Sequence, residues 1–159
     1  MRLYHGSNLE IVIPKLMEKK RILDFGNGFY LTTSMEQANR WAELVTKRRK
    51  EGSPIVSVFE MDENRYQSLS VLRFDSPNAE WLDCVSKYRS GRNLESDWDM
   101  IIGPVANDNT MPVLNLYFDG ILEKEETIKR LLPQKLKDQF VCKTEKALSA
   151  LKFIEVIYV

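Results

Sequence analysis

Several residues with the potential for chemistry lie close together near the start of the chain. Three of the seven glycines fall within the first 28 residues, where they flank His5, the sole histidine, and Tyr30. A glycine has no side chain, so its backbone N–H and C=O can come close to a planar amide. A neighbouring histidine can hydrogen-bond a hydroxyl group, and the rings of Tyr30 and Trp41 can stack on a flat cation. The closeness of these residues makes this part of the chain the candidate functional site.

Each of these residues also has a plain structural explanation. A single histidine near an N-terminus is usually incidental, and the Gly-x-Gly sequence at 26–28 is commonly no more than a turn. Trp41 lies on the apolar face of an expected helix, where core packing is as reasonable as ligand contact. The order and spacing of the residues, taken together, are what favour a site.

The elements that must position these residues alternate along the chain between strands and helices. Strands are expected at 3–5, 29–32, 55–61, 69–74, 100–105, 139–142 and 153–159. Helices are expected from the cap Ser34 to Gly52, from Ser76 and Pro77 onward, at 112–119, at 123–132, and from the cap Thr144 through Leu151. The mixture of short strands with helices between them predicts an α+β fold.

Length and charge exclude some classes of function. A chain of 159 residues suits one domain, which we expect to span residues 1–159. Lys+Arg and Asp+Glu both number 23, so a formal net charge of zero gives no general attraction to nucleic acid or to a membrane surface. The basic run at 47–50 is more simply the solvated end of a helix, because cations favour a helix C-terminus.

Metal and disulfide patterns are missing from the sequence. Cys84 and Cys142 are far apart and have no CxxC spacing, and with one histidine the sequence indicates neither a zinc site nor a disulfide framework. We therefore expect no metal. The first residues lack the apolar run of a signal peptide, and no stretch approaches membrane-spanning length. We expect a cytoplasmic protein without membrane contact.

Two N-terminal segments carry a resemblance to a known superfamily. Residues 3–7 (LYHGS) and 26–30 (GNGFY) resemble the first two signature segments of the ADP-ribosyltransferases, in the His-Tyr-Glu branch of poly(ADP-ribose) polymerases and diphtheria-type toxins. In that branch a strand ends in His-Gly, and a Gly-x-Gly segment with a tyrosine opens the next strand. The family's nicotinamide pocket also uses an aromatic residue eleven positions after that tyrosine, which is Trp41 here. The resemblance covers residues 3–42 well and 138–142 loosely.

The resemblance implies a split, bent β-sheet core with flanking helices, and NAD⁺ as the substrate. It implies that His5 positions the adenosine-side ribose, that Tyr30 and Trp41 hold nicotinamide, and that the catalytic residues are His5, Tyr30 and Gln139. It implies further NAD⁺ contacts from Gly6, Ser7, Asn27, Gly28, Phe29 and Trp41.

The third signature position departs from the family. The family has a glutamate at the start of a late strand, and the matching segment 138–142 (DQFVC) places Gln139 there. An amide can hydrogen-bond a ribose hydroxyl, but it has no charge to stabilise an oxocarbenium ion or to activate a nucleophile. Asp138 is expected on the opposite face of the strand, and Glu145 is more simply an acid at a helix N-terminus.

A polar loop follows the strand expected at 100–105. The run at 103–108 (GPVAND) and a glutamine at the third position recur in a bacterial family of uncharacterised proteins, placed in this superfamily, which the whole chain resembles. Asn107 and Asp108 are good turn formers. As site residues they would orient the acceptor or contact a ribose of NAD⁺.

The function that the resemblance implies is mono-ADP-ribosyl transfer from NAD⁺, with release of nicotinamide. Such a protein would suit the toxin of a toxin–antitoxin or phage-defence pair, with an unknown macromolecular or small-molecule acceptor and an antitoxin protein as a possible partner. Two alternatives remain open. One is an NAD⁺ glycohydrolase, and the other is a non-catalytic module that binds NAD⁺, ADP-ribose or a protein.

Overall fold

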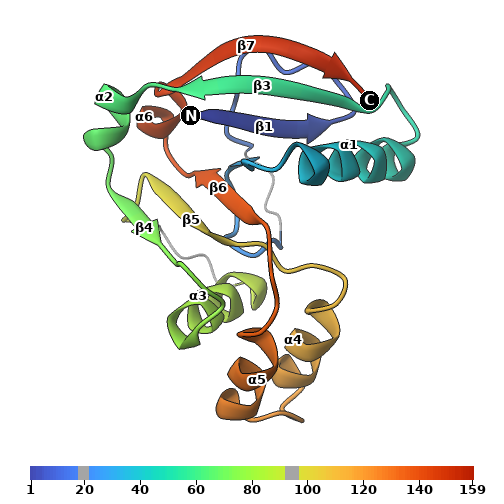
Figure 1. The fold of residues 1–159 in the computed structure, drawn as a ribbon, viewed down its shortest axis with the longest axis vertical. Helices are drawn as coiled ribbons and strands as arrows, with labels where there is room; N and C mark the ends of the chain where they lie inside the picture. The colour runs from blue at the N-terminus through green and yellow to red at the C-terminus, as the bar shows by residue number, and fades with distance from the viewer. Residues whose placement is uncertain (18–21, 92–96) are drawn as a thin grey trace.

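The computed structural model describes residues 1–17, 22–91 and 97–159. The described residues form two open β-sheets and six α-helices, so the fold is α+β. The first sheet has the strand order β1-β3-β7 and the second β2-β6-β5-β4. In Figure 1 the first sheet lies above the second, with α1 beside the first and α3, α4 and α5 below the second.

The first sheet is antiparallel and is built from β1 (Arg2–Ser7), β3 (Ile55–Met61) and β7 (Leu151–Tyr158). Side chains alternate between its faces. Leu3 and Phe59 point to the second sheet, into the main hydrophobic core. Val56 and Val58 point to the other face, where Ala38 and Ala42 of α1 (Met35–Arg49) cover them. Because both faces of β3 are covered, its sequence is almost continuously apolar, and its predicted bounds are confirmed.

The second sheet is built from β2 (Phe29–Leu31), β4 (Val71–Arg73), β5 (Met100–Pro104) and β6 (Asp138–Cys142). Only the β4–β5 pair is parallel. The remaining helices are α2 (Glu63–Gln67), α3 (Ala79–Arg89), α4 (Met111–Phe118), α5 (Lys124–Leu131) and α6 (Glu145–Leu148). A second core lies under this sheet, where Ile101 and Val141 pack against Trp81 of α3, Leu114 of α4 and Leu131 of α5.

The two sheets meet at one backbone bridge between β1 and the end of β2. The Tyr4 N–H donates to the Thr32 carbonyl at 2.8 Å, and the Thr32 N–H donates back at 3.0 Å. In an antiparallel pair the next bonded residues would be Gly6 and Tyr30. No such backbone pair forms, so the sheets separate beyond the bridge. The carbonyl and N–H of Gly6 lie on the same strand edge as those of Tyr4 and face this opening.

Several helix boundaries differ from the sequence-based expectations. α1 is capped by Ser34, whose side chain accepts from the Gln37 N–H, as predicted, but the helix ends at Arg49. Lys50 takes the left-handed conformation (φ 54°) and is the C-cap, two residues before Gly52. α3 begins after Asn78, whose Oδ1 accepts from the Trp81 N–H at 2.9 Å, so the expected start at Ser76 is wrong.

The strand bounds also differ in places. β4 covers three residues where 69–74 was expected, and the short helix α2 before it was not predicted. Thr144 caps α6 as predicted, but that helix ends at Leu148, and Leu151 already belongs to β7. Five-residue and four-residue helices carry too few periodic positions for a sequence pattern to define their ends. Within the described ranges, no helix is both long and apolar enough to cross a membrane.

Gly6→Ala should destabilise the protein strongly. A Cβ at this position would lie 2.1 Å from the Ala38 carbonyl oxygen and 2.8 Å from the Ala42 nitrogen. Both atoms belong to the α1 backbone, so relief requires the strand and the helix to move apart. We expect the free energy of unfolding, measured by urea denaturation, to fall by about 3 kcal/mol. Gly120→Ala is the control, because no atom lies within 4 Å of its Cβ position and only its φ of +76° is strained. Equal losses in the two variants would contradict this account of Gly6.

Candidate functional site

A cavity of about 760 Å³ lies where the two sheets separate. His5, Tyr30 and Gln139, which the sequence resemblance singles out as catalytic, all line it. Four of the six residues expected to contact NAD⁺ line it as well: Gly6, Gly28, Phe29 and Trp41. The fold therefore brings residues from β1, β2, α1 and β6 together, although more than 130 positions separate the first from the last.

The His5 side chain connects the two sheets where the next backbone hydrogen-bonded pair is absent. Its Nδ1 lies 2.7 Å from the carbonyl oxygen of Tyr30, and because that oxygen can only accept, Nδ1 carries the hydrogen. The imidazole also stacks on the Phe29 ring, with 4.2 Å between the ring centroids. In the neutral ring Nε2 is then an acceptor. The imidazole thus has a fixed orientation at the point where the sheets diverge.

The Tyr30 hydroxyl is used to hold the turn that precedes its own strand. It donates to the Gly26 carbonyl at 2.6 Å and accepts from the Phe25 N–H at 3.2 Å. Burial is the main cause that raises the pKa of Tyr30, so the hydroxyl stays neutral. Gly26 has a φ of +69°, as the sequence allows for a glycine in this turn. Tyr30 therefore borders the cavity, while its hydroxyl holds the turn.

Lys143 also holds the turn at 25–28, through hydrogen bonds to its backbone. Its Nζ donates to the Phe25 carbonyl at 2.5 Å and to the Asn27 carbonyl, and lies 4.7 Å from the centroid of the Tyr88 ring. Burial lowers the pKa of Lys143 to about 8. Asn27 does not line the cavity, and its backbone carbonyl accepts a hydrogen bond from Lys143.

Gln139 is 2 % exposed, and its amide is tied to fixed acceptors. Its Nε2 donates to the Asp24 carboxylate at 3.2 Å and to the Pro104 carbonyl at 3.1 Å. Asp138, its neighbour on β6, points to the opposite face as expected, where it accepts from the Thr32 hydroxyl at 3.0 Å. Glu145 is likewise found in the first turn of α6.

Asp24 and Arg89 are site residues that the sequence reasoning missed. The Asp24 carboxylate is 5 % exposed, and its Oδ1 accepts from Arg89 Nε at 2.8 Å and Nη2 at 2.5 Å. Its Oδ2 accepts from the Ala106 N–H at 2.9 Å as well as from Gln139. Both Asp24 and Arg89 line the cavity. The available signal was an acidic residue directly before the turn at 25–28, but its partner lies 65 positions away.

The cavity side of α1 changes from aromatic to cationic along the helix. Trp41, Val45 and Arg48 follow one another at spacings of four and three residues, which places them on one side of the helix, and all three line the cavity. Trp41 is half-buried and borders the cavity. The basic run at 47–50 is exposed as predicted, but Arg48 and Arg49 also border the cavity.

The charges on the cavity wall are unequal. Among the described lining residues Asp24 is the single acidic side chain, while the basic side chains are Lys15, Arg48, Arg49 and Arg89. Arg89 is neutralised by its ion pair with Asp24. The remaining cations give the cavity a positive potential in a chain of zero net charge.

Besides Asn27, three of the candidate residues lie away from the cavity. Ser7 is buried and does not line it. Asn107 accepts from the Thr110 N–H at 2.9 Å and so shapes the turn before α4, which fits its turn-forming role. Asp108 is exposed and pairs with Arg40 of α1. Within the described part of the chain, no three His, Cys, Asp or Glu side chains are grouped so that they could hold a metal ion.

Comparison with known proteins gives one match. The model of a family described as "Protein of unknown function (DUF3990)" matches residues 1–153. No curated protein and no solved structure is significantly similar to the chain.

Tyr30→Phe should lower the stability of the protein without removing the ring from the cavity. The change leaves the Phe25 N–H and the Gly26 carbonyl without their partner, which should cost about 1–3 kcal/mol of unfolding free energy. Tyr117→Phe is the matched control, because among the described contacts its hydroxyl makes no hydrogen bond, and it should change stability by less than about 0.5 kcal/mol. Equal melting temperatures for the Tyr30 variant and the wild type would show that the hydroxyl does not hold the turn.

Proposed function

The chain belongs to the DUF3990 family, and we propose that it binds NAD⁺ in the cavity between its two sheets and transfers ADP-ribose from it to an acceptor. The observation that carries the proposal is the separation of β1 from β2 at the His5–Tyr30 contact. That separation opens a cavity bordered by Gly6, Tyr30, Trp41 and Gln139, which is the set implied by the resemblance to ADP-ribosyltransferases.

The size of the cavity supports a ligand as large as a dinucleotide. Its volume of about 760 Å³ lies within the roughly 300–1,000 Å³ of typical ligand pockets. Its wall combines aromatic and aliphatic side chains with a few fixed polar groups, as small-molecule sites generally do.

The nicotinamide end would lie against β1 and the first turns of α1. The backbone N–H and carbonyl of Gly6 face the opening, where they can pair with a carboxamide. The rings of Tyr30 and Trp41 border the same space, and a pyridinium ring gains both burial and cation–π attraction from such faces.

The reacting ribose would lie beside Gln139, while His5 would contact the adenosine-side ribose. Cleavage of the nicotinamide–ribose bond leaves the bonding electron pair on nicotinamide and develops positive charge on the sugar. The acceptor then forms a bond to the same carbon and loses its proton. The site's contribution is chiefly orientation, because Asp24, the acidic side chain nearest Gln139, is already neutralised by Arg89.

The diphosphate would lie along the second half of α1. Trp41 and Arg48 are seven residues apart, about 10.5 Å along a helix axis, so an anion beside Arg48 is compatible with a ring beside Trp41. Lys15 and Arg49 add to the same positive region.

One observation favours a second candidate function, an NAD⁺-binding or ADP-ribose-binding module without catalysis. Gln139 carries no charge, and its amide nitrogen is fully used inside the protein.

The biological setting that we propose is a bacterial toxin whose antitoxin covers the mouth of the cavity. In support, Ile13, Met17 and Leu44 line the cavity and are exposed.

Incubation of the purified protein with NAD⁺ labelled in its ADP-ribose part, in the presence of a bacterial lysate, separates these functions. We expect label on a macromolecule or small acceptor. Free ADP-ribose alone would instead indicate a glycohydrolase. Intact NAD⁺ with a raised melting temperature would indicate a binding module, since ligand at one hundred times Kd stabilises a protein by about 2.7 kcal/mol.

The control for this experiment is a pair of tryptophan variants. Trp41→Ala should abolish both the reaction and the melting shift, because it removes a ring from the cavity wall. Trp98→Ala should keep both, since Trp98 does not line the cavity. Intact NAD⁺ and an unchanged melting temperature in the wild type would contradict the proposal.

A further inference from the structure

The orientation of the Gln139 amide is fixed by its neighbours. The two groups that contact Nε2 are the Asp24 carboxylate, at 3.2 Å, and the Pro104 carbonyl, at 3.1 Å. Both can only accept hydrogen bonds, so they use both hydrogens of Nε2. The reverse placement would set the amide oxygen against two other oxygens. Nε2 therefore points into the protein, and Oε1 does not.

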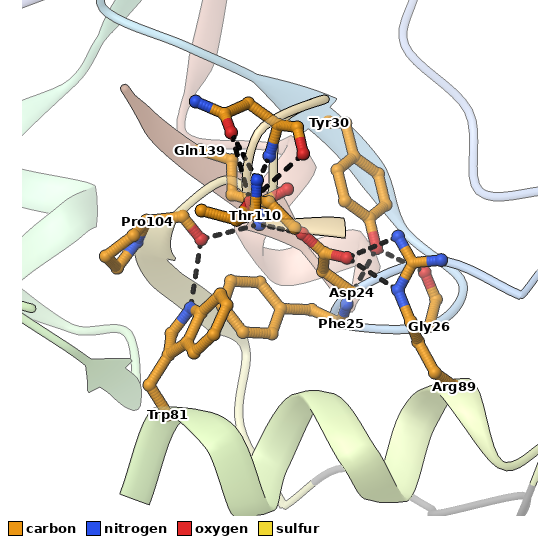
Figure 2. Close-up of polar contacts among 11 residues, drawn as sticks. Asp24, Phe25, Gly26, Tyr30, Trp81, Arg89, Pro104, Thr110 and Gln139 are labelled. Atoms are coloured by element: carbon orange, nitrogen blue, oxygen red, sulfur yellow. Dashed lines mark hydrogen bonds and ion pairs between the residues drawn. The ribbon is translucent and has the colours of Figure 1, made fainter. Parts of the chain in front are cut away.

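Asp24 and Pro104 are themselves held by other groups, as Figure 2 shows. Arg89 donates twice to Asp24 Oδ1, at 2.8 and 2.5 Å, and the Ala106 N–H donates to Oδ2 at 2.9 Å. Trp81 Nε1 donates to the Pro104 carbonyl at 3.0 Å. The acceptors that meet Gln139 therefore stay in place whatever residue stands at position 139.

We infer that Asp24 is a positioning residue that holds Gln139 as a hydrogen-bond acceptor for the ligand. Gln139 lines the cavity, and among the described residues no group donates to its Oε1. The ligand group at this point must then be a donor, such as a hydroxyl. That this hydroxyl belongs to the ribose of NAD⁺ rests on the proposed function, whereas the orientation of the amide does not.

In this arrangement a glutamate at position 139 could not make the hydrogen bonds that the glutamine makes to Asp24 and Pro104. A glutamate would place one carboxylate oxygen where Nε2 now lies, next to the Asp24 carboxylate and the Pro104 carbonyl. Two carboxylates at such a distance cannot both ionise without strong repulsion, and they would share one proton. Among the described groups, Arg89 of α3 pairs with Asp24, and Tyr30 of β2 interacts electrostatically with both. His5, Lys15, Arg48 and Arg49 border the same cavity. Glutamate is therefore compatible with this site only when the charge of Asp24 is removed.

The test compares wild type with Gln139→Glu, Asp24→Asn and the double variant. We measure NAD⁺ affinity and turnover at about pH 8 and about pH 5.5, together with melting temperature. Gln139→Glu should lose at least about tenfold in affinity or turnover at the higher pH and recover at the lower pH, where the carboxyl pair holds a proton. The double variant should recover part of the loss at the higher pH, because it removes the repulsion between the two carboxylates.

The matched control is Asp138→Asn. Asp138 is the neighbour of Gln139 on β6, but it contacts Thr32 and Thr33 on the other face and does not line the cavity. This variant should keep the pH profile of the wild type.

Two results would overturn the inference. One is a Gln139→Glu variant that matches the wild type at both pH values, and the other is a double variant no better than Gln139→Glu alone. If the wild type binds no NAD⁺, the proposed function fails, but the melting temperatures still test the pair. Gln139→Glu should then melt lower than the wild type, and the double variant should melt higher than Gln139→Glu. Without that recovery, Asp24 does not position residue 139.

Discussion

The site depends on the place where strand pairing stops. β1 and β2 make one backbone bridge, at Tyr4 and Thr32, and the next pair in that register would be Gly6 with Tyr30. The His5 imidazole bonds to the Tyr30 carbonyl instead, so the sheets stay connected while the backbone edges part. Closing this split would join the two sheets and remove the cavity. The loss of one backbone pair between β1 and β2 thus accompanies the cavity.

The walls of the split are held rigid by buried polar contacts that would be costly if left incomplete. On one side the Tyr30 hydroxyl and Lys143 fix the turn at 25–28 through backbone atoms. On the other side the Asp24 carboxylate accepts hydrogen bonds from Arg89, the Ala106 N–H and Gln139. Apart from Gln139 Oε1, the described side-chain groups of this network are hydrogen-bonded within the protein.

Local patterns in the sequence predicted much of the fold. The apolar run of β3 and the cap at Ser34 were found correctly because each depends on residues adjacent in the chain. That His5 and Gln139 line one cavity agrees with the order of the segments that resemble the ADP-ribosyltransferases. The Asp24–Arg89 pair could not be predicted, since its partners are 65 residues apart and only tertiary packing selects one arginine among the cations of the chain. The orientation of the Gln139 amide depends on that pair, so the sequence could not predict it either.

We propose that the cavity between the two sheets binds NAD⁺, with nicotinamide at the Gly6 end and a ribose hydroxyl on Gln139. The most direct measurement is a crystal structure of the protein with NAD⁺ or a non-cleavable analogue. We expect the pyridine ring between Tyr30 and Trp41, and a ligand hydroxyl within hydrogen-bond distance of Gln139 Oε1. A ligand bound elsewhere, or one that meets Gln139 through Nε2 with the Asp24 contact broken, would contradict it.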